Sequence, residues 1–188
     1  PGLTALALES QGALFLCLAA RWKLMARPSH IHIPLGLSAR LTLTSHFFST
    51  CLPGNGAGDL VKGWIFSRRG SEFGIVLGTM VLDRAMGMAG MFLTWSFFLA
   101  TAIATRPESF AMLLPFLVAA VGATAGFLAA IGFAKRIHAW LERRPEPRRA
   151  RLAQAVRFVR RTVEPVSKGA DAPGSIATAL ALSVAIQL

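Results

Sequence analysis

Long apolar runs separated by short polar segments dominate this chain of 188 residues. Three runs, at residues 3–20, 73–104 and 110–134, have about the length of the roughly 20 apolar residues with which a helix crosses a bilayer. A fourth run starts near residue 176 and is still apolar at residue 188. The pattern predicts an all-α, polytopic transmembrane helix bundle. Because the chain starts on Pro1 and stops within an apolar run, we expect it to be a fragment of a larger bundle.

The composition supports a membrane protein. Hydrophobic residues make up 54% of the chain and the mean hydropathy is +0.53, values that a soluble domain of this size rarely reaches. The two cysteines, Cys17 and Cys51, lie far apart and belong to no CxxC pair, so free thiols are expected rather than a disulfide or a zinc site.

The positive charge is concentrated rather than spread over the chain. The net charge is +11, and more than half of the 20 lysines and arginines lie within residues 135–168, directly after an apolar run. This distribution follows the positive-inside rule of membrane proteins better than the basic face of a nucleic-acid-binding domain. We therefore expect a multi-pass protein of the cytoplasmic membrane and no nucleic-acid partner.

The basic residues also indicate how the first half of the chain is threaded. Basic residues follow the first run and precede the run at residue 73, so both loops are expected inside, with the near-neutral loop 105–109 outside. The residues that mark the two inner loops are Arg21, Lys23, Arg27, Lys62, Arg68 and Arg69. Residues 35–60 lie between these loops and are apolar enough to enter the bilayer. They must enter the bilayer and return on one side, or lie along the interface. A re-entrant element that turns through the sequence PGNGAGD fits this requirement and is the prediction.

Residues 135–168 form a basic cytoplasmic segment. Within it, apolar residues recur at helical spacing over residues 148–166, and basic residues surround them. The arginines in this part are Arg149, Arg157, Arg160 and Arg161. The pattern predicts a basic amphipathic helix on the anionic surface of the membrane, with a solvated cytoplasmic loop as the alternative.

Two ionisable residues, Asp83 and Arg84, interrupt the apolar run 73–104. Charged groups at membrane depth are costly and usually face a partner or a wet cavity. Since neighbours on a helix do not face each other, each is expected to have a different partner. The pair either lines a functional cavity or belongs to a structural ion network, and the residues alone leave both readings open.

Small residues accompany this pair along the same run. Gly87, Gly90 and Thr94 share the helical face of Asp83, where they would admit another backbone or leave room for a ligand. Gly70, Gly74 and Gly78 form a GxxxGxxxG ridge on roughly the opposite face. This ridge predicts close packing against another helix.

The sequence LPGNGAGDLVKG, residues 52–63, is expected to be a flexible, glycine-rich loop. It matches neither the Walker A pattern nor GxGxxG. The backbone N–H groups near Gly54, Gly56 and Gly58 could form an anion-binding nest. Asp59 would repel an anion unless Lys62 or an arginine pairs with it. A plain flexible turn is the alternative.

No catalytic or metal site is expected. His30, His32 and His46 lack a metal-binding arrangement, and Ser45 and Ser49 have no recognisable base partner. We therefore expect no catalytic residues, no metal and no cofactor.

Three motifs, taken in order, are similar to those of a known family. They are RWK after the first run, the phenylalanine-rich segment that leads into the glycine-rich one, and VLDRAMGMAG. The matching residues are Arg21, Trp22, Phe47, Phe48, Pro53, Gly54, Gly58, Asp59, Lys62, Asp83, Arg84 and Gly87. Together they resemble the lysylphosphatidylglycerol synthase transmembrane region, the flippase-like family. The chain departs from the family pattern at Ala57, where glycine is usual, and at Lys62, where arginine is usual.

The resemblance implies a membrane protein that binds and translocates anionic lipids by their phospholipid or polyprenyl-phosphate head groups. Arg84 and Lys62 would attract the head group, Asp59 and Asp83 would orient these cations, and the glycines, including Gly87, would make room for it. Arg21 and Trp22 are expected at the membrane interface. Membrane lipids are the expected partners, and homo-oligomer formation is left open.

Two other functions stay open at this point: a membrane-embedded transferase that acts on a lipid-linked phosphate, and a structural subunit without transport activity. Some relatives carry a soluble aminoacyl-transferase domain, but nothing in these residues resembles it. Aminoacyl transfer is therefore not expected of this chain.

Overall fold

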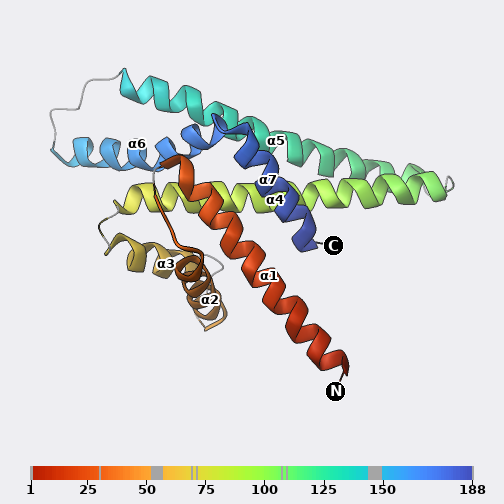
Figure 1. Cartoon of the computed structure of the whole chain (residues 1–188). Coiled ribbons are helices and arrows are strands. Elements are labelled where there is room, and N and C mark those ends of the chain that lie inside the picture. Colours follow the sequence, from red (N-terminus) through yellow and green to blue (C-terminus); the bar gives the residue numbers. More distant parts are fainter. Residues whose placement is uncertain are drawn as a thin grey trace.

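The computed structural model describes residues 2–29, 31–51, 57–68, 70, 72–106, 108, 110–143 and 150–187. Its elements are α1 (Gly2–Ala26), the short 3-10 helix η1 (Arg27–Ser29), α2 (Leu35–Cys51), α3 (Ala57–Ser67), α4 (Phe73–Thr105), α5 (Phe110–Glu142), α6 (Ala150–Ala170) and α7 (Pro173–Gln187) (Figure 1). No strand occurs within the described residues, so the predicted all-α class is confirmed.

Three helical segments are long and apolar enough to cross a membrane. They are Gly2–Ser29, Phe73–Thr105 and Phe110–Glu142, and α6 with α7 would make a fourth span if this pair, bent by 89°, counts as one. At 1.5 Å per residue, the 33 residues of α4 extend over about 50 Å. This exceeds the roughly 30 Å hydrocarbon core of a bilayer, so α4 must tilt or project beyond it.

The basic segment 135–168 divides between two helices. The helix that starts at Phe110 continues through Glu142, so the first part of the segment extends α5. The later part forms α6, which contains the predicted amphipathic helix and includes Pro165. Arg149 lies outside the described residues.

α6 is built into the bundle, whereas a helix lying only on the membrane surface was expected. One face packs on α4 and α5, and η1 also contacts it. Two of its predicted lipid-facing arginines have protein partners. Arg160 Nη2 donates to the Leu141 carbonyl oxygen at 2.6 Å, and Arg161 Nε pairs with Glu72 Oε2 at 2.9 Å. Leu152, Phe158 and Val159 of α6 are exposed, and contact of this helix with the membrane surface stays a prediction.

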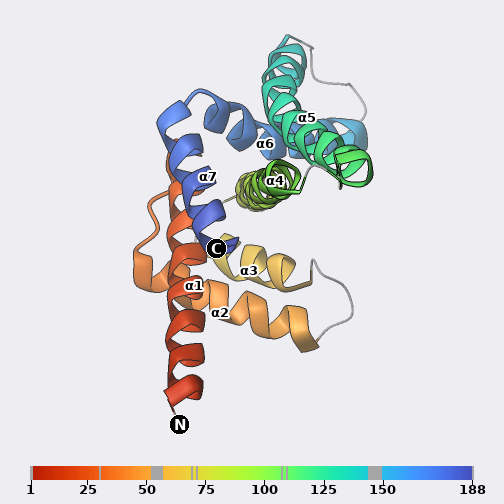
Figure 2. The same ribbon diagram turned by 90° about the vertical axis from the view of Figure 1, so that its right-hand side faces the viewer.

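α4 is the central helix of the bundle. Figure 2 looks nearly along α4 and shows α3, α5, α6 and α7 around it. Glycines on α4 permit the closest approaches. A Cβ at Gly78 would lie 2.2 Å from the Thr162 carbonyl oxygen of α6, and one at Gly90 would lie 2.3 Å from Ser183 Cβ of α7. The predicted packing role of the glycine ridge is thus confirmed at Gly78.

The ridge is shorter than expected. Gly74 also lies against α6, where an added Cβ would be 3.0 Å from Arg161 Cβ. Gly70, however, precedes α4 and has a φ of +95°, a left-handed conformation that favours glycine. Gly70 therefore shapes a turn and takes no part in helix packing.

α2 and α3 form a helical hairpin. Both views show the two helices side by side, so the chain leaves along α2 and returns along α3 (Figures 1 and 2). This geometry suits the predicted re-entrant element, whose position in the membrane stays a prediction. The predicted flexible loop is wrong at its C-terminal part, because Gly58 and Asp59 already belong to the first turn of α3. Gly54 and Gly56 lie outside the described residues.

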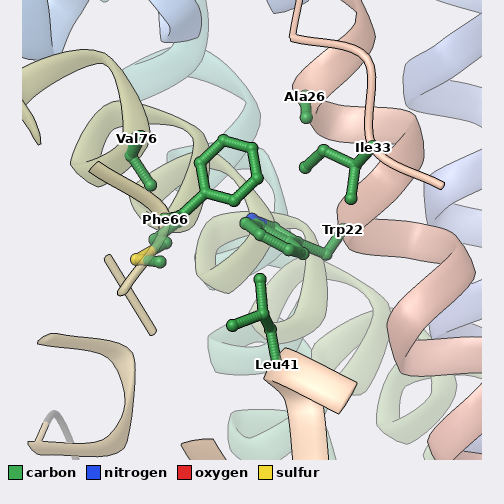
Figure 3. Packing of buried hydrophobic residues seen from close by; sticks show 7 residues of the cluster. Trp22, Ala26, Ile33, Leu41, Phe66 and Val76 are labelled. Atoms are coloured by element: carbon green, nitrogen blue, oxygen red, sulfur yellow. The ribbon is translucent and has the colours of Figure 1, made fainter. Parts of the chain in front are cut away.

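A buried apolar cluster joins the hairpin to α1 and α4. Trp22 is only 1% exposed and meets Phe66 of α3 edge-on, with ring centroids 5.8 Å apart. The cluster consists of Trp22, Ala26, Ile33, Leu41, Phe66, Val76 and Met80 (Figure 3). Burial of these side chains fixes α3 against α4, and this contact positions the polar residues described next.

Candidate functional site

Five charged residues from three helices line one polar cavity of about 190 Å³. They are Arg21 of α1, Asp59 and Lys62 of α3, and Asp83 and Arg84 of α4. Hydroxyl groups and an imidazole from α2 complete the wall, with Thr42, Ser45, His46 and Ser49. Three cations and two carboxylates give the cavity one net positive charge. The structure thus brings together the charged residues that the sequence predicted for a head-group site.

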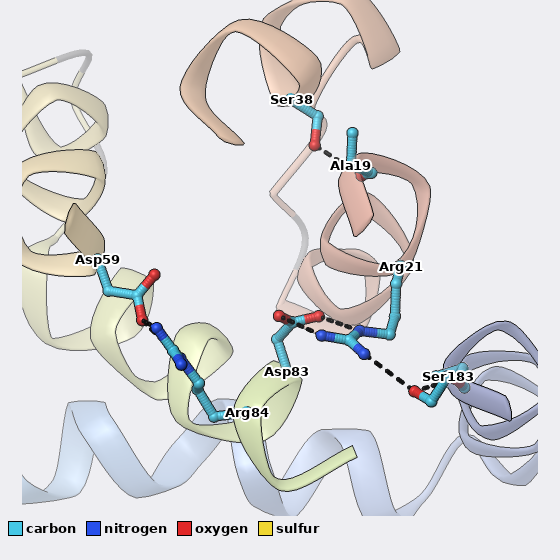
Figure 4. Close-up of polar contacts among 8 residues, drawn as sticks. Ala19, Arg21, Ser38, Asp59, Asp83, Arg84 and Ser183 are labelled. Carbon is cyan, nitrogen blue, oxygen red and sulfur yellow. Dashed lines mark hydrogen bonds and ion pairs between the residues drawn. The ribbon is translucent and has the colours of Figure 1, made fainter. Parts of the chain in front are cut away.

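The first ion pair joins α1 to α4 and is buried. Arg21 Nε lies 2.8 Å from Asp83 Oδ1, and Arg21 Nη2 donates to Asp83 Oδ2 at 3.1 Å (Figure 4). The remaining nitrogen, Nη1, donates to Ser183 Oγ of α7 at 3.0 Å. Gly87 makes room for this guanidinium, since an added Cβ would lie 3.1 Å from Nη1. Arg21 therefore ties three helices together.

The second ion pair joins α3 to α4 and is more open. Arg84 Nη2 and Nε lie 2.6 and 2.7 Å from the same oxygen, Asp59 Oδ2 (Figure 4). The other carboxylate oxygen accepts a hydrogen bond from Ser45 Oγ at 3.2 Å. The Arg84 side chain is 52% exposed, compared with 8% for Arg21. The two ion pairs thus differ mainly in their access to the surroundings.

Lys62 is the enclosed cation of the cavity. It is 5% exposed, and its Nζ lies 3.8 Å from the centroid of the Trp22 ring, a cation–π geometry. Among the residues that the structure describes, no carboxylate lies within salt-bridge distance of this ammonium group. Thr42, also on the cavity wall, is buried and its Oγ1 has no hydrogen-bond partner there. The cavity therefore presents a hydroxyl group without a hydrogen-bond partner and an ammonium group without a carboxylate at salt-bridge distance among the described residues.

Gly58 acts differently from the prediction. An added Cβ would lie 1.8 Å from the Ser45 carbonyl oxygen and 2.3 Å from Ser49 Oγ. Because Gly58 is helical, it serves the close approach of α3 to α2 and is not part of an anion-binding loop. Its effect on the site is indirect, since this approach sets Asp59 beside Ser45.

No metal centre emerges from the described parts of the chain. They contain no group of three or more His, Cys, Asp or Glu side chains that could hold a metal ion. Asp59 and Asp83 are each occupied by a guanidinium group, and His46 packs edge-on against Phe15 with ring centroids 5.1 Å apart. The groups that can interact with a ligand are therefore cations and hydroxyl groups, which suit an anion.

The sequence interpretation missed part of the cavity. The sequence predicts Arg21 and Trp22 at the membrane interface; in the structure both are buried, with Arg21 on the cavity wall and Trp22 against Lys62. The hydroxyl groups of α2 were considered only as nucleophiles. A signal was present: Ser38, Thr42, Ser45 and Ser49 recur at helical spacing along one side of an otherwise apolar segment.

Comparison with known proteins connects this arrangement to a family. The family model described as the lysylphosphatidylglycerol synthase TM region matches residues 1–188. Neither a curated protein nor a solved structure matches the chain. The family match spans the helices that build the cavity, together with the apolar helices that can cross a membrane. The chain belongs to the lysylphosphatidylglycerol synthase transmembrane region family, whose members are integral membrane proteins related to lipid modification or transport.

Proposed function

We propose that the polar cavity binds the anionic head group of a membrane lipid and that the protein carries this lipid across the cytoplasmic membrane. The observation that carries the proposal is Lys62, a cation enclosed in an apolar bundle without a carboxylate at salt-bridge distance among the described residues. Burying a charge without a directly paired counter-ion is costly, so a site of this kind favours an anionic ligand.

The charge of the cavity suits a phosphodiester. One net positive charge complements the single negative charge that such a group carries. The Lys62 ammonium group would provide the charge, and the free hydroxyl group of Thr42 would donate a hydrogen bond to a phosphate oxygen. Hydrogen bonds in which one partner is ionised are about twice as strong as neutral ones. Together these groups would replace part of the hydration that the head group loses on leaving water.

The two ion pairs would have different tasks in transport. Arg21 is held by Asp83 and by Ser183, so it would remain part of the framework. Arg84 is half-exposed and would exchange Asp59 for the phosphate as the lipid enters or leaves. In such an exchange Arg84 would face an anion at each stage, and Asp59 would keep the hydrogen bond that Ser45 Oγ donates to it.

A binding experiment with purified protein tests the proposal. Native mass spectrometry would compare dioleoyl phosphatidylglycerol with zwitterionic dioleoyl phosphatidylcholine. We expect a preference for the anionic lipid that Lys62→Met removes and that the control Lys168→Met, outside the cavity and paired with Glu164, keeps. A preference that survives Lys62→Met would contradict the proposed site.

A further inference from the structure

The polar cavity shares part of its wall with a larger apolar groove. The groove has a volume of about 520 Å³, and Asp59 and Arg84 line both spaces. The rest of its lining is apolar and includes Leu60, Leu77, Val81, Met88 and Phe127. One ion pair therefore stands between a polar compartment and an apolar one.

We propose that this groove holds an acyl chain of the lipid whose head group occupies the cavity, and that the Asp59–Arg84 ion pair is the gate between them. The inference rests on the proposed function and specifies its substrate as an amphiphile that enters sideways from the bilayer. A water-soluble anion of the same head-group chemistry would leave the groove empty.

The volumes of the cavity and the groove agree with a head group in the first and an acyl chain in the second. Sites for small molecules usually measure about 300–1,000 Å³. The cavity, at about 190 Å³, is below that range and can enclose only a compact polar group. The groove, at about 520 Å³, lies within the range and offers apolar surface from α3, α4 and α5. A lipid with its phosphate beside Arg84 would place its head group in the cavity and an acyl chain in the groove.

The contrast between the ion pairs identifies which one can open. The Arg21–Asp83 pair uses both carboxylate oxygens and has side chains only 8% and 17% exposed. Arg84 contacts a single oxygen of Asp59, and its side chain is 52% exposed. Pairs that water reaches are weak because water screens them, as it would in a hydrated polar cavity, whereas opening a buried pair strands a charge. When Arg84 turns to a phosphate, Asp59 keeps its hydrogen bond from Ser45.

A second apolar groove supplies a matched control. It has a volume of about 590 Å³ and lies between α4, α5 and α7, where its lining includes Leu93, Phe97, Leu117 and Val184. None of the described residues that line it is charged. Val81 of the first groove and Leu93 of the second lie on the same helix and are similarly exposed, at 50% and 44%. Tryptophan at either position would fill its groove without displacing a buried side chain.

The test compares Val81→Trp and Leu93→Trp in binding two anionic lipids with one head group, dioleoyl and dihexanoyl phosphatidylglycerol. We expect the parental protein to prefer the long-chain lipid, because apolar contacts with the groove add to binding. Val81→Trp should weaken long-chain binding about tenfold and leave short-chain binding unchanged, whereas Leu93→Trp should change neither. Met88→Trp, in the first groove, should reproduce Val81→Trp and guards against a local folding defect.

The outcomes separate the two proposals. If the parental protein prefers anionic lipid but Val81→Trp and Met88→Trp bind the long-chain form like the parent, the acyl groove is wrong and the head-group site stands. If the parental protein shows no preference for an anionic head group, both proposals fail. If Val81→Trp instead changes the oligomeric state in size-exclusion chromatography with light scattering, the groove is an interface between copies and the acyl-chain assignment is overturned.

Discussion

Asp83 and Arg84 are neighbours in sequence, yet their side chains bind partners on different helices, Arg21 of α1 and Asp59 of α3. A single turn of α4 therefore connects two ion pairs that both line the polar cavity. One pair is buried and anchored further by Ser183, whereas the other is open to the surroundings. On this asymmetry rests our proposal that the buried pair has a structural task and the open pair a task in transport.

Removing Asp83 should destabilise the protein. In Asp83→Asn, the guanidinium group of Arg21 would stay buried without its counter-ion, at a cost on the order of 3–5 kcal/mol. We expect less folded protein in the membrane and a lower midpoint of thermal unfolding in detergent. The double variant Asp83→Leu with Arg21→Met should recover much of this stability, because it leaves no unpaired charge. A single variant as stable as the parent would contradict the structural role.

Opening the other ion pair should leave the fold intact. Asp59→Asn and Arg84→Gln each break a partly exposed pair, for which a loss of about 0–1 kcal/mol is expected after screening. Transfer of a fluorescent anionic lipid between the leaflets of reconstituted vesicles should nevertheless fall sharply. Variants that are folded and move lipid at the parental rate would refute the transport role of this pair.

The hairpin should be sensitive to the size of residue 58. A side chain in Gly58→Val would meet the Ser45 carbonyl oxygen, where even a Cβ would lie 1.8 Å away, so α3 must move away from α2. Overpacking of this kind costs about 1–3 kcal/mol or more. The control Gly36→Val has nothing within 4 Å of an added Cβ and makes the same change of helix propensity, since Gly36 and Gly58 are each the second residue of a helix. Equal thermal stability of the two variants would show that the close approach is unimportant.

The ends of the hairpin should be accessible from one side of the membrane. Gly36 is exposed at the start of α2, and Ser67 is half-buried at the end of α3. Single cysteines at these positions, in a background without Cys17 and Cys51, should react with an impermeant thiol reagent from the cytoplasmic side only. Labelling of one cysteine from each side would mean that the hairpin region crosses the membrane.

Hydropathy and motif order were sufficient to predict the class of fold and the family. Apolar runs of spanning length follow directly from the residues, and charges inside such a run indicate partners elsewhere. The identities of those partners were out of reach, because Arg21 and Asp83 are 62 positions apart and Arg21 and Ser183 are 162 apart. Which residues meet at such separations in sequence depends on how the helices pack, and periodicity does not determine that packing.

The misreading of the glycine-rich segment has a similar cause. Glycine permits both a turn and a close helix contact, and the sequence does not distinguish these uses. At Gly58 the helix contact applies, and the tight fit against Ser45 becomes visible only when α2 and α3 are placed together. For the same reason, the depth at which Lys62 is enclosed could not be predicted from its place after the glycines.

The most direct test of the central claim measures what Lys62 contributes to lipid affinity. Native mass spectrometry of the purified protein would give dissociation constants of phosphatidylglycerol for the parental protein, Lys62→Met and the control Lys168→Met. A hydrogen bond to a charged group contributes about 1.5–3 kcal/mol, so Lys62→Met should bind about 10- to 100-fold more weakly while remaining folded. Parental affinity in a folded Lys62→Met variant would contradict the assignment of this cavity as the head-group site.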